Sequence, residues 1–184
     1  MAKYILLIFT FFIPLLGIAK DETPELVTDR PDQTESSSIV PLNSLQIESG
    51  FVLETNETGA EKIYNVTYNS TLFRYGLFEN MELRLGLEYL GEDIDIKNTD
   101  TLHQTSGLSP LSAGVKVKIA KEKGLIPDMA FLGGLVLPFT AHEDFKPSYP
   151  AANMRVAFAH TISDRFSIGY NIGAEWDGET AIPA

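Results

Sequence analysis

Charged and amide side chains recur at every second position in several segments of this chain. Glu82 and Arg84 form one such pair, and Lys116 and Lys118 form another. Residues two apart on a β-strand point to the same face. The pattern predicts one set of interior residues: Glu48, Glu54, Glu82, Arg84, Glu88, Lys116, Lys118, Asn153, Arg155, Asn171 and Glu175. Around a pore, opposed acidic and basic side chains would select solutes by charge and width. In the alternative, they pair across the interior and fill it.

Catalysis is not indicated by these residues. The histidines are His103, His142 and His160, and His142 precedes two acidic residues in a polar stretch. That stretch lacks the spacing of a metal site and favours a solvated loop. The sequence contains neither a G-x-S-x-G motif nor a phosphate-binding or dinucleotide-binding loop. We therefore expect no catalytic residue, no metal site and no cofactor.

The elements that must carry the interior residues are strands of alternating polarity. From Phe166 to Trp176, apolar residues with aromatics at both ends alternate with small or polar ones. This is typical of an outer-membrane β-barrel strand, with lipid outside and water inside. We predict seven strands, over residues 44–55, 63–77, 81–90, 111–120, 127–138, 151–161 and 166–176. The second loses its phase after Leu72, which predicts a bulge there.

The predicted connections alternate in length. Those after the first, third and fifth strands are longer loops, over residues 56–62, 91–110 and 139–150, and the others are short turns. Outer-membrane barrels have short periplasmic turns and longer extracellular loops. The pattern therefore predicts an antiparallel up-and-down transmembrane barrel over residues 44–184, with the N-terminus in the periplasm.

The N-terminus reads as a secretory signal peptide over residues 1–19. A lysine precedes an apolar run, and Gly17 to Ala19 supply small residues for cleavage after Ala19. Residues 20–43 are predicted to be an extended periplasmic lead-in, because Pro31 and Pro41 disfavour a helix. The chain has no cysteine and a net charge of -11, which argues against a disulfide-stapled module and against nucleic acid as a partner.

One family resemblance rests on the lead-in and on parts of the strands. Its most specific part is Thr28, Asp29, Arg30, Pro31, Asp32, Gln33, Thr34, Glu35 and Ser36. Residues 40–41, 45–51, 107–118 and 133–138 extend it. These segments resemble the transporter-like, porin-like outer-membrane proteins called the meta-pathway phenol-degradation family. The resemblance implies an outer-membrane barrel that passes small aromatic or hydrophobic solutes, with membrane lipid and the solute as its partners.

The role of residues 28–36 has three interpretations. They fold into the interior as a plug, they bind a periplasmic partner, or they form a solvated tether with polar turns. In the first, Arg30 would meet an interior carboxylate.

Seven strands are an odd number, whereas single-chain bacterial barrels use an even one. We therefore expect a curved, open sheet from these residues and further strands encoded beyond Ala184. Two alternatives to a solute-passing barrel remain at this point: a non-conducting structural barrel in the outer membrane, and a soluble secreted β-sandwich.

Overall fold

Alternating side chains produce one antiparallel sheet over most of the chain. The computed structural model describes residues 26–29, 34–58, 61–96 and 102–179. Its elements are β1 (Leu45–Thr58), β2 (Glu61–Phe78), β3 (Met81–Ile96), β4 (Leu102–Leu108), β5 (Leu111–Ala120), β6 (Asp128–Leu137), the 3-10 turns η2 (Pro138–Thr140) and η3 (Glu143–Phe145), β7 (Ala151–Ser163) and β8 (Phe166–Trp176). The predicted signal peptide lies outside the described residues.

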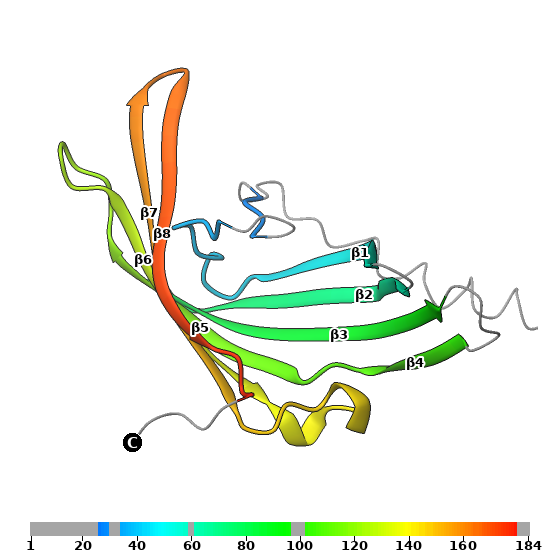
Figure 1. Ribbon diagram of the computed structural model, residues 1–184. Coiled ribbons are helices and arrows are strands. Elements are labelled where there is room, and N and C mark those ends of the chain that lie inside the picture. Colours follow the sequence, from blue (N-terminus) through cyan, green and yellow to red (C-terminus); the bar gives the residue numbers. More distant parts are fainter. Residues whose placement is uncertain (1–25, 30–33, 59–60, 97–101, 180–184) are drawn as a thin grey trace, which may run out of the picture.

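The strands follow one another in space as they do in sequence. Their order is β1-β2-β3-β5-β6-β7-β8, and every neighbouring pair is antiparallel. The sheet curls into an open half-barrel, as Figure 1 shows. The predicted all-β, up-and-down fold with seven strands in order is confirmed. No helix in the described part of the chain is long and apolar enough to cross a membrane.

An eighth strand lies outside that order and corrects the predicted loops. Residues 91–96 continue β3 and pair with β4, so most of the predicted loop over 91–110 is a hairpin. Similarly, β1 and β2 remain paired as far as Thr58 and Glu61, where a loop was predicted over 56–62. Backbone hydrogen bonds hold such hairpins together whatever their side chains are. The prediction missed them because these segments are polar and do not alternate regularly. The predicted loop over 139–150 is confirmed.

The bulge in the second strand lies earlier than predicted. In the pairing of β2 with β3, Thr67 lies opposite Leu90 and Asn69 opposite Tyr89, which leaves Tyr68 as the extra residue. Leu72 is therefore buried on the concave face, whereas the sequence pattern put it on the apolar face. A bulge reverses the faces of every residue that follows it. Arg74 faces inward for the same reason, as it would also do with the predicted bulge after Leu72.

The two faces of the sheet differ in character. The concave face buries charged residues and a few small or branched apolar ones, including Leu72, Ala130 and Leu132. Large apolar side chains stay exposed on the convex face; they include Leu45, Ile47, Phe51, Leu53, Tyr75, Leu83, Leu85, Tyr89, Phe131, Leu135, Phe166, Ile168, Tyr170 and Ile172. The described residues form one sheet, without the second packed sheet of a β-sandwich.

A tight turn leads the chain into β1 at the end of β2. Asn43 adopts a left-handed conformation with φ of 58°, which asparagine tolerates better than most residues. Its backbone N–H donates to the Gly76 carbonyl at 2.8 Å, and the Gly76 N–H donates to the Ser44 carbonyl at 3.0 Å. A Cβ on Gly76 would lie 2.0 Å from the Pro41 carbonyl oxygen. Gly76 therefore allows the backbone before β1 to cross β2.

The substitution Gly76→Ala should test this crossing. The added methyl meets backbone that cannot move easily, so we expect a loss of about 1–3 kcal/mol of unfolding free energy. Gly50→Ala is the matched control, because a Cβ there meets nothing within 4 Å. Denaturant unfolding in detergent micelles measures both. Equal stabilities of the two variants would contradict the assigned role of Gly76.

Candidate functional site

The backbone before β1 returns across the concave face of the sheet. We call residues 26–29 and 34–40 the interior segment; in Figure 1 it is the blue stretch on the side toward which the sheet curves. At β1 the Gln46 side chain donates to the Val27 carbonyl at 3.0 Å, and at β5 the Lys118 Nζ donates to the Ser37 carbonyl at 2.9 Å. The segment is therefore bonded to strands across the half-barrel, as the plug interpretation requires.

Arg74 of β2 is the hub of the concave face. Its Nε and Nη2 donate to the two Glu82 carboxylate oxygens at 2.8 and 3.0 Å, and its Nη1 donates to Glu48 Oε1 at 2.9 Å. The same guanidinium also donates to the backbone carbonyls of Val27 and Ser38, at 2.9 and 3.1 Å. Only 1% of the Arg74 side chain is exposed. Strand side chains and the interior segment thus share one buried cation.

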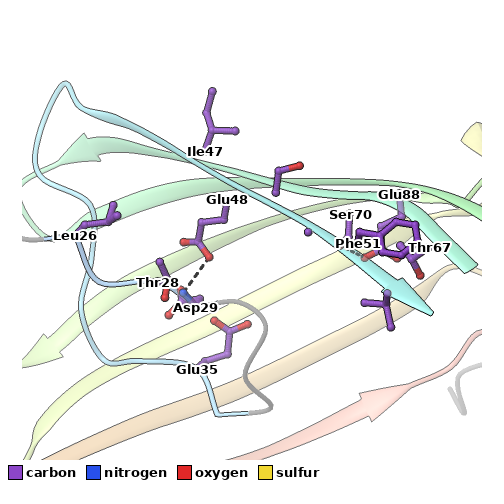
Figure 2. Close-up of a pocket in the computed structure, with 13 residues that line it drawn as sticks. Leu26, Thr28, Asp29, Glu35, Ile47, Glu48, Phe51, Thr67, Ser70 and Glu88 are labelled. Carbon is purple, nitrogen blue, oxygen red and sulfur yellow. Dashed lines mark hydrogen bonds between the residues drawn. The ribbon is translucent and has the colours of Figure 1, made fainter. Parts of the chain in front are cut away.

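Asp29 is the interior segment's counterpart to that hub. Its carboxylate accepts hydrogen bonds from Lys116 Nζ and, at 2.6 Å, from Arg84 Nη1, and it lies 3.3 Å from Arg74. Figure 2 shows its backbone N–H donating to Glu48, at 3.0 Å. Burial acts to raise the pKa of the Asp29 carboxyl, but Lys116 and the two arginines outweigh it and hold this pKa well below its usual range.

Glu35 is bound less completely than Asp29. Arg84 Nη2 donates to its two carboxylate oxygens at 3.2 and 2.9 Å, while 22% of the Glu35 side chain stays exposed. Burial raises the pKa of the Glu35 carboxyl above its usual value; Arg84 opposes this rise and the nearby Asp29 charge adds to it. Glu35 therefore gives up its charge more easily than Asp29.

We call this group of side chains the ionic cluster. It consists of the carboxylates of Asp29, Glu35, Glu48 and Glu82 and the cations of Arg74, Arg84 and Lys116. Among the described residues, no buried side-chain nitrogen or oxygen lacks a hydrogen-bond partner. Removing one of its fully buried members leaves the partners buried with unbalanced charge, which is strongly destabilising.

The predicted interior residues fall into two groups. Glu48, Glu82, Arg84 and Lys116 come together in the ionic cluster, and Lys118 lies beside it, paired with Asp128 of β6. The others lie apart from the cluster: Glu54, Glu88, Asn153, Arg155, Asn171 and Glu175. Of these, Glu88 accepts a hydrogen bond from Ser70 at 2.7 Å, and Arg155 lies 4.0 Å from Glu175.

Asn171 connects β8 to the interior segment. In the amide orientation that satisfies both polar atoms, its oxygen accepts from the Glu35 N–H at 2.7 Å and its nitrogen donates to the Glu35 carbonyl at 3.1 Å. The backbone of Glu35 is thus held by β8 while its side chain is held by β3. Arg30, Pro31, Asp32 and Gln33, with the predicted role of Arg30, lie outside the described residues.

Arg74 is the residue that the sequence pattern missed. The predicted bulge after Leu72 returned Phe73 and Tyr75 to the apolar side of the second strand and so left Arg74 on the polar side, but Arg74 was not included among the predicted interior residues. The observed bulge at Tyr68 gives Arg74 this same inward orientation, in phase with the other charged residues. The available signal was the alternation of Arg74 with Phe73, Tyr75 and Leu77, because Arg74 must face the interior if these apolar residues face lipid.

Two of the cavities that border the interior segment meet at Glu35. The larger, about 610 Å³, lies between the segment and β1–β3, and its walls include Leu26, Thr67 and Glu88. Figure 2 shows Glu35, Glu48 and Glu88 around it. The smaller, about 190 Å³, is lined by Glu35, Arg84 and residues of β2, β5, β6 and β7. Glu35 lines both, so its pair with Arg84 separates them.

Metal ligation finds no support in the described residues. No group of three His, Cys, Asp or Glu side chains there could hold a metal ion. His142 Nδ1 lies 3.2 Å from Asp144 Oδ2, with both side chains about half exposed.

A curled up-and-down sheet with polar residues inside and apolar residues outside defines a barrel-type protein. The chain belongs to the family described as "Putative MetA-pathway of phenol degradation", whose model matches residues 28–181. That family is generally described as an outer-membrane transporter-like β-barrel. The resemblance seen in the sequence is thereby confirmed. Neither a curated protein nor a solved structure matches the chain significantly.

Substitution of the two cluster carboxylates of the interior segment should have unequal costs. Asp29→Asn leaves Lys116 and Arg84 buried without their shared counter-charge, and should lower the free energy of unfolding by about 3–5 kcal/mol. Glu35→Gln removes a partly exposed partner and should cost about 1 kcal/mol or less. Urea unfolding in detergent micelles at pH 7 measures both. Similar losses would contradict the assignment of Asp29 as the anchor.

A fall in pH should change the stability of the fold in opposite directions through Asp29 and through Glu35. The lowered pKa of Asp29 stabilises the fold above its unfolded value of about 4, and this contribution is lost as the pH falls toward the folded value. The raised pKa of Glu35 favours folding as the pH falls through it. The melting temperature should therefore hold or rise slightly from pH 7 to about 4 and drop below that. Glu35→Gln should abolish only the rise; a steady decline from pH 7 would contradict this account.

Proposed function

We propose that this protein is an exported outer-membrane β-barrel that admits small solutes past its interior segment. The observation that carries the proposal is the division of the sheet. Charged residues and the interior segment lie on the concave face, and large exposed apolar residues lie on the convex face. In water that convex surface would favour association, whereas in a bilayer it is the surface that lipid requires. Membership of a transporter-like barrel family supports the same assignment.

The length of the apolar band suits a single crossing of a membrane. On β3, outward residues from Met81 to Tyr89 are apolar or aromatic, and on β8 the band runs from Phe166 to Trp176. A tilted membrane strand needs about 9–11 residues. The Tyr68 and Tyr89 rings, 6.0 Å apart, lie where an aromatic girdle would meet the headgroups. The predicted signal peptide would supply export.

Solute would pass beside the interior segment rather than through an empty pore. The cavities of about 610 and 190 Å³ lie on either side of the Glu35–Arg84 pair. The charges around them set which solutes enter.

A non-conducting structural barrel is the second candidate. The observation in its favour is the ionic cluster, which fills the concave face with paired charges. Small barrels have interiors just wide enough for side chains to fill, and a filled interior leaves no path for solute. Flux measurements separate the two candidates.

Conductance of the full chain in planar lipid bilayers tests solute passage. The wild type should give small, resolvable channels, and Lys118→Gln should enlarge them, because Lys118 ties the Ser37 carbonyl and Asp128 together. Lys123→Gln is the matched control, since it removes the same charge from the turn between β5 and β6. Absence of conductance and of solute flux in all three proteins would contradict transport and support the structural barrel.

A further inference from the structure

We propose that Arg84 is a binding site for the carboxylate of a small monocarboxylic acid, and that Glu35 fills this site in the absence of solute. This inference deepens the proposed function by naming the class of solute, and it rests on that proposal for its biological setting. Its physical basis is that one carboxylate can replace another at the same guanidinium.

The present occupant of the site defines its chemistry. Arg84 Nη2 donates to both Glu35 oxygens, at 3.2 and 2.9 Å. The planar guanidinium recognises carboxylates with strong, charge-assisted hydrogen bonds. Arg84 Nη1 is committed elsewhere, to Asp29 at 2.6 Å and Glu82 at 3.0 Å. Exchange at Nη2 would therefore leave the anchoring half of the guanidinium in place.

Arg84 is the cluster cation that a solute can reach. Its side chain is 11% exposed, against 1% for Arg74 and 0% for Lys116. It lines the cavity of about 190 Å³ together with Ser112, Asn153 and Leu132. That volume is below the range for drug-sized ligands, which limits the solute to a small molecule. A hydroxyl and an amide offer polar contacts there, and Leu132 offers an apolar wall.

Charge balance makes the exchange feasible. The groups that face the Glu35 side chain are Arg84, Lys116 at 3.9 Å and Asp29. When a solute carboxylate takes its place at Arg84, Glu35 can turn toward the cavities or bind a proton. Its raised pKa shows that its charge is held weakly. Asp29, which holds the interior segment, is not disturbed.

A second cation lies along the approach to this site. Arg155 of β7 lines a neighbouring cavity with Thr34 and Asn171. It lies two residues from Asn153 on the same face of the strand, about 7 Å away. The Arg155 guanidinium is only loosely paired, since the Glu175 carboxylate lies 4.0 Å from it. Arg155 can therefore attract an anion before that anion reaches Arg84.

Calorimetric titration of the detergent-solubilised full chain tests the site with benzoate as the probe. Benzamide is the neutral control for the probe, because it has the same shape without the charge. Glu35→Gln removes the internal competitor and should bind benzoate about tenfold tighter than the wild type, the equivalent of one charge-assisted hydrogen bond. Glu88→Gln is the matched control, because it removes an equal charge from the interior at a residue bonded to Ser70. Its affinity for benzoate should match the wild type.

Two results would overturn the inference. Equal tightening in Glu35→Gln and Glu88→Gln would mean that the interior responds only to total charge. An equal increase in the affinity of Glu35→Gln for benzamide and for benzoate would mean that the substitution only enlarges the cavity. The titration requires no conduction, so its failure leaves solute passage intact. Conversely, tight benzoate binding in Glu35→Gln without conductance would keep the site and remove the transport role.

Discussion

Neutralisation of buried charge on the concave face is the constraint on which the rest of this structure depends. Strand pairing places Arg74 directly opposite Arg84 on neighbouring strands, and like charges in that arrangement repel. Glu82 Oε1 accepts a hydrogen bond from each of them, at 2.8 and 3.0 Å. Asp29 supplies the second shared carboxylate from outside the sheet. The interior segment is therefore part of the electrostatics of the sheet rather than an addition to it.

The same constraint explains local features that alternation alone does not. The bulge at Tyr68 sets the phase of the second half of β2, and that phase brings Arg74 to Glu48 and Glu82. Without a bulge before it, Arg74 would lie on the apolar convex face, where it would have no counter-charge. At the end of β2, Gly76 leaves room for the crossing backbone that carries Asp29 and Glu35 inward.

The division of the carboxylates within the interior segment links the fold to its proposed use. Asp29 is fully enclosed among cations and holds the segment, whereas Glu35 lies at the border of two cavities on the more accessible arginine of the ionic cluster. Anchoring and recognition are thus assigned to different residues six positions apart. A solute can then compete for one without displacing the other.

The sequence by itself determined the strands whose two faces meet different surroundings. Residues 111–120 and 166–176 were predicted with their observed bounds, because strict alternation of apolar and polar residues indicates a β-strand. It also determined the family, and it placed Glu48, Glu82, Arg84 and Lys116 on one face. The hairpin ends of β1–β2 and of β3–β4, which extend beyond the apolar band, were not predicted. Backbone hydrogen bonds hold them, and these do not require a particular pattern of side chains.

Only the tertiary structure decided which interior charges meet, and that the residues around Asp29 and Glu35 pack inside. Asp29 and Lys116 are far apart in sequence, and no local pattern relates them. Their contact depends on the curvature of the whole sheet, which encloses the interior segment and brings it against β5. Curvature is a property of many paired strands, and no single strand contains it.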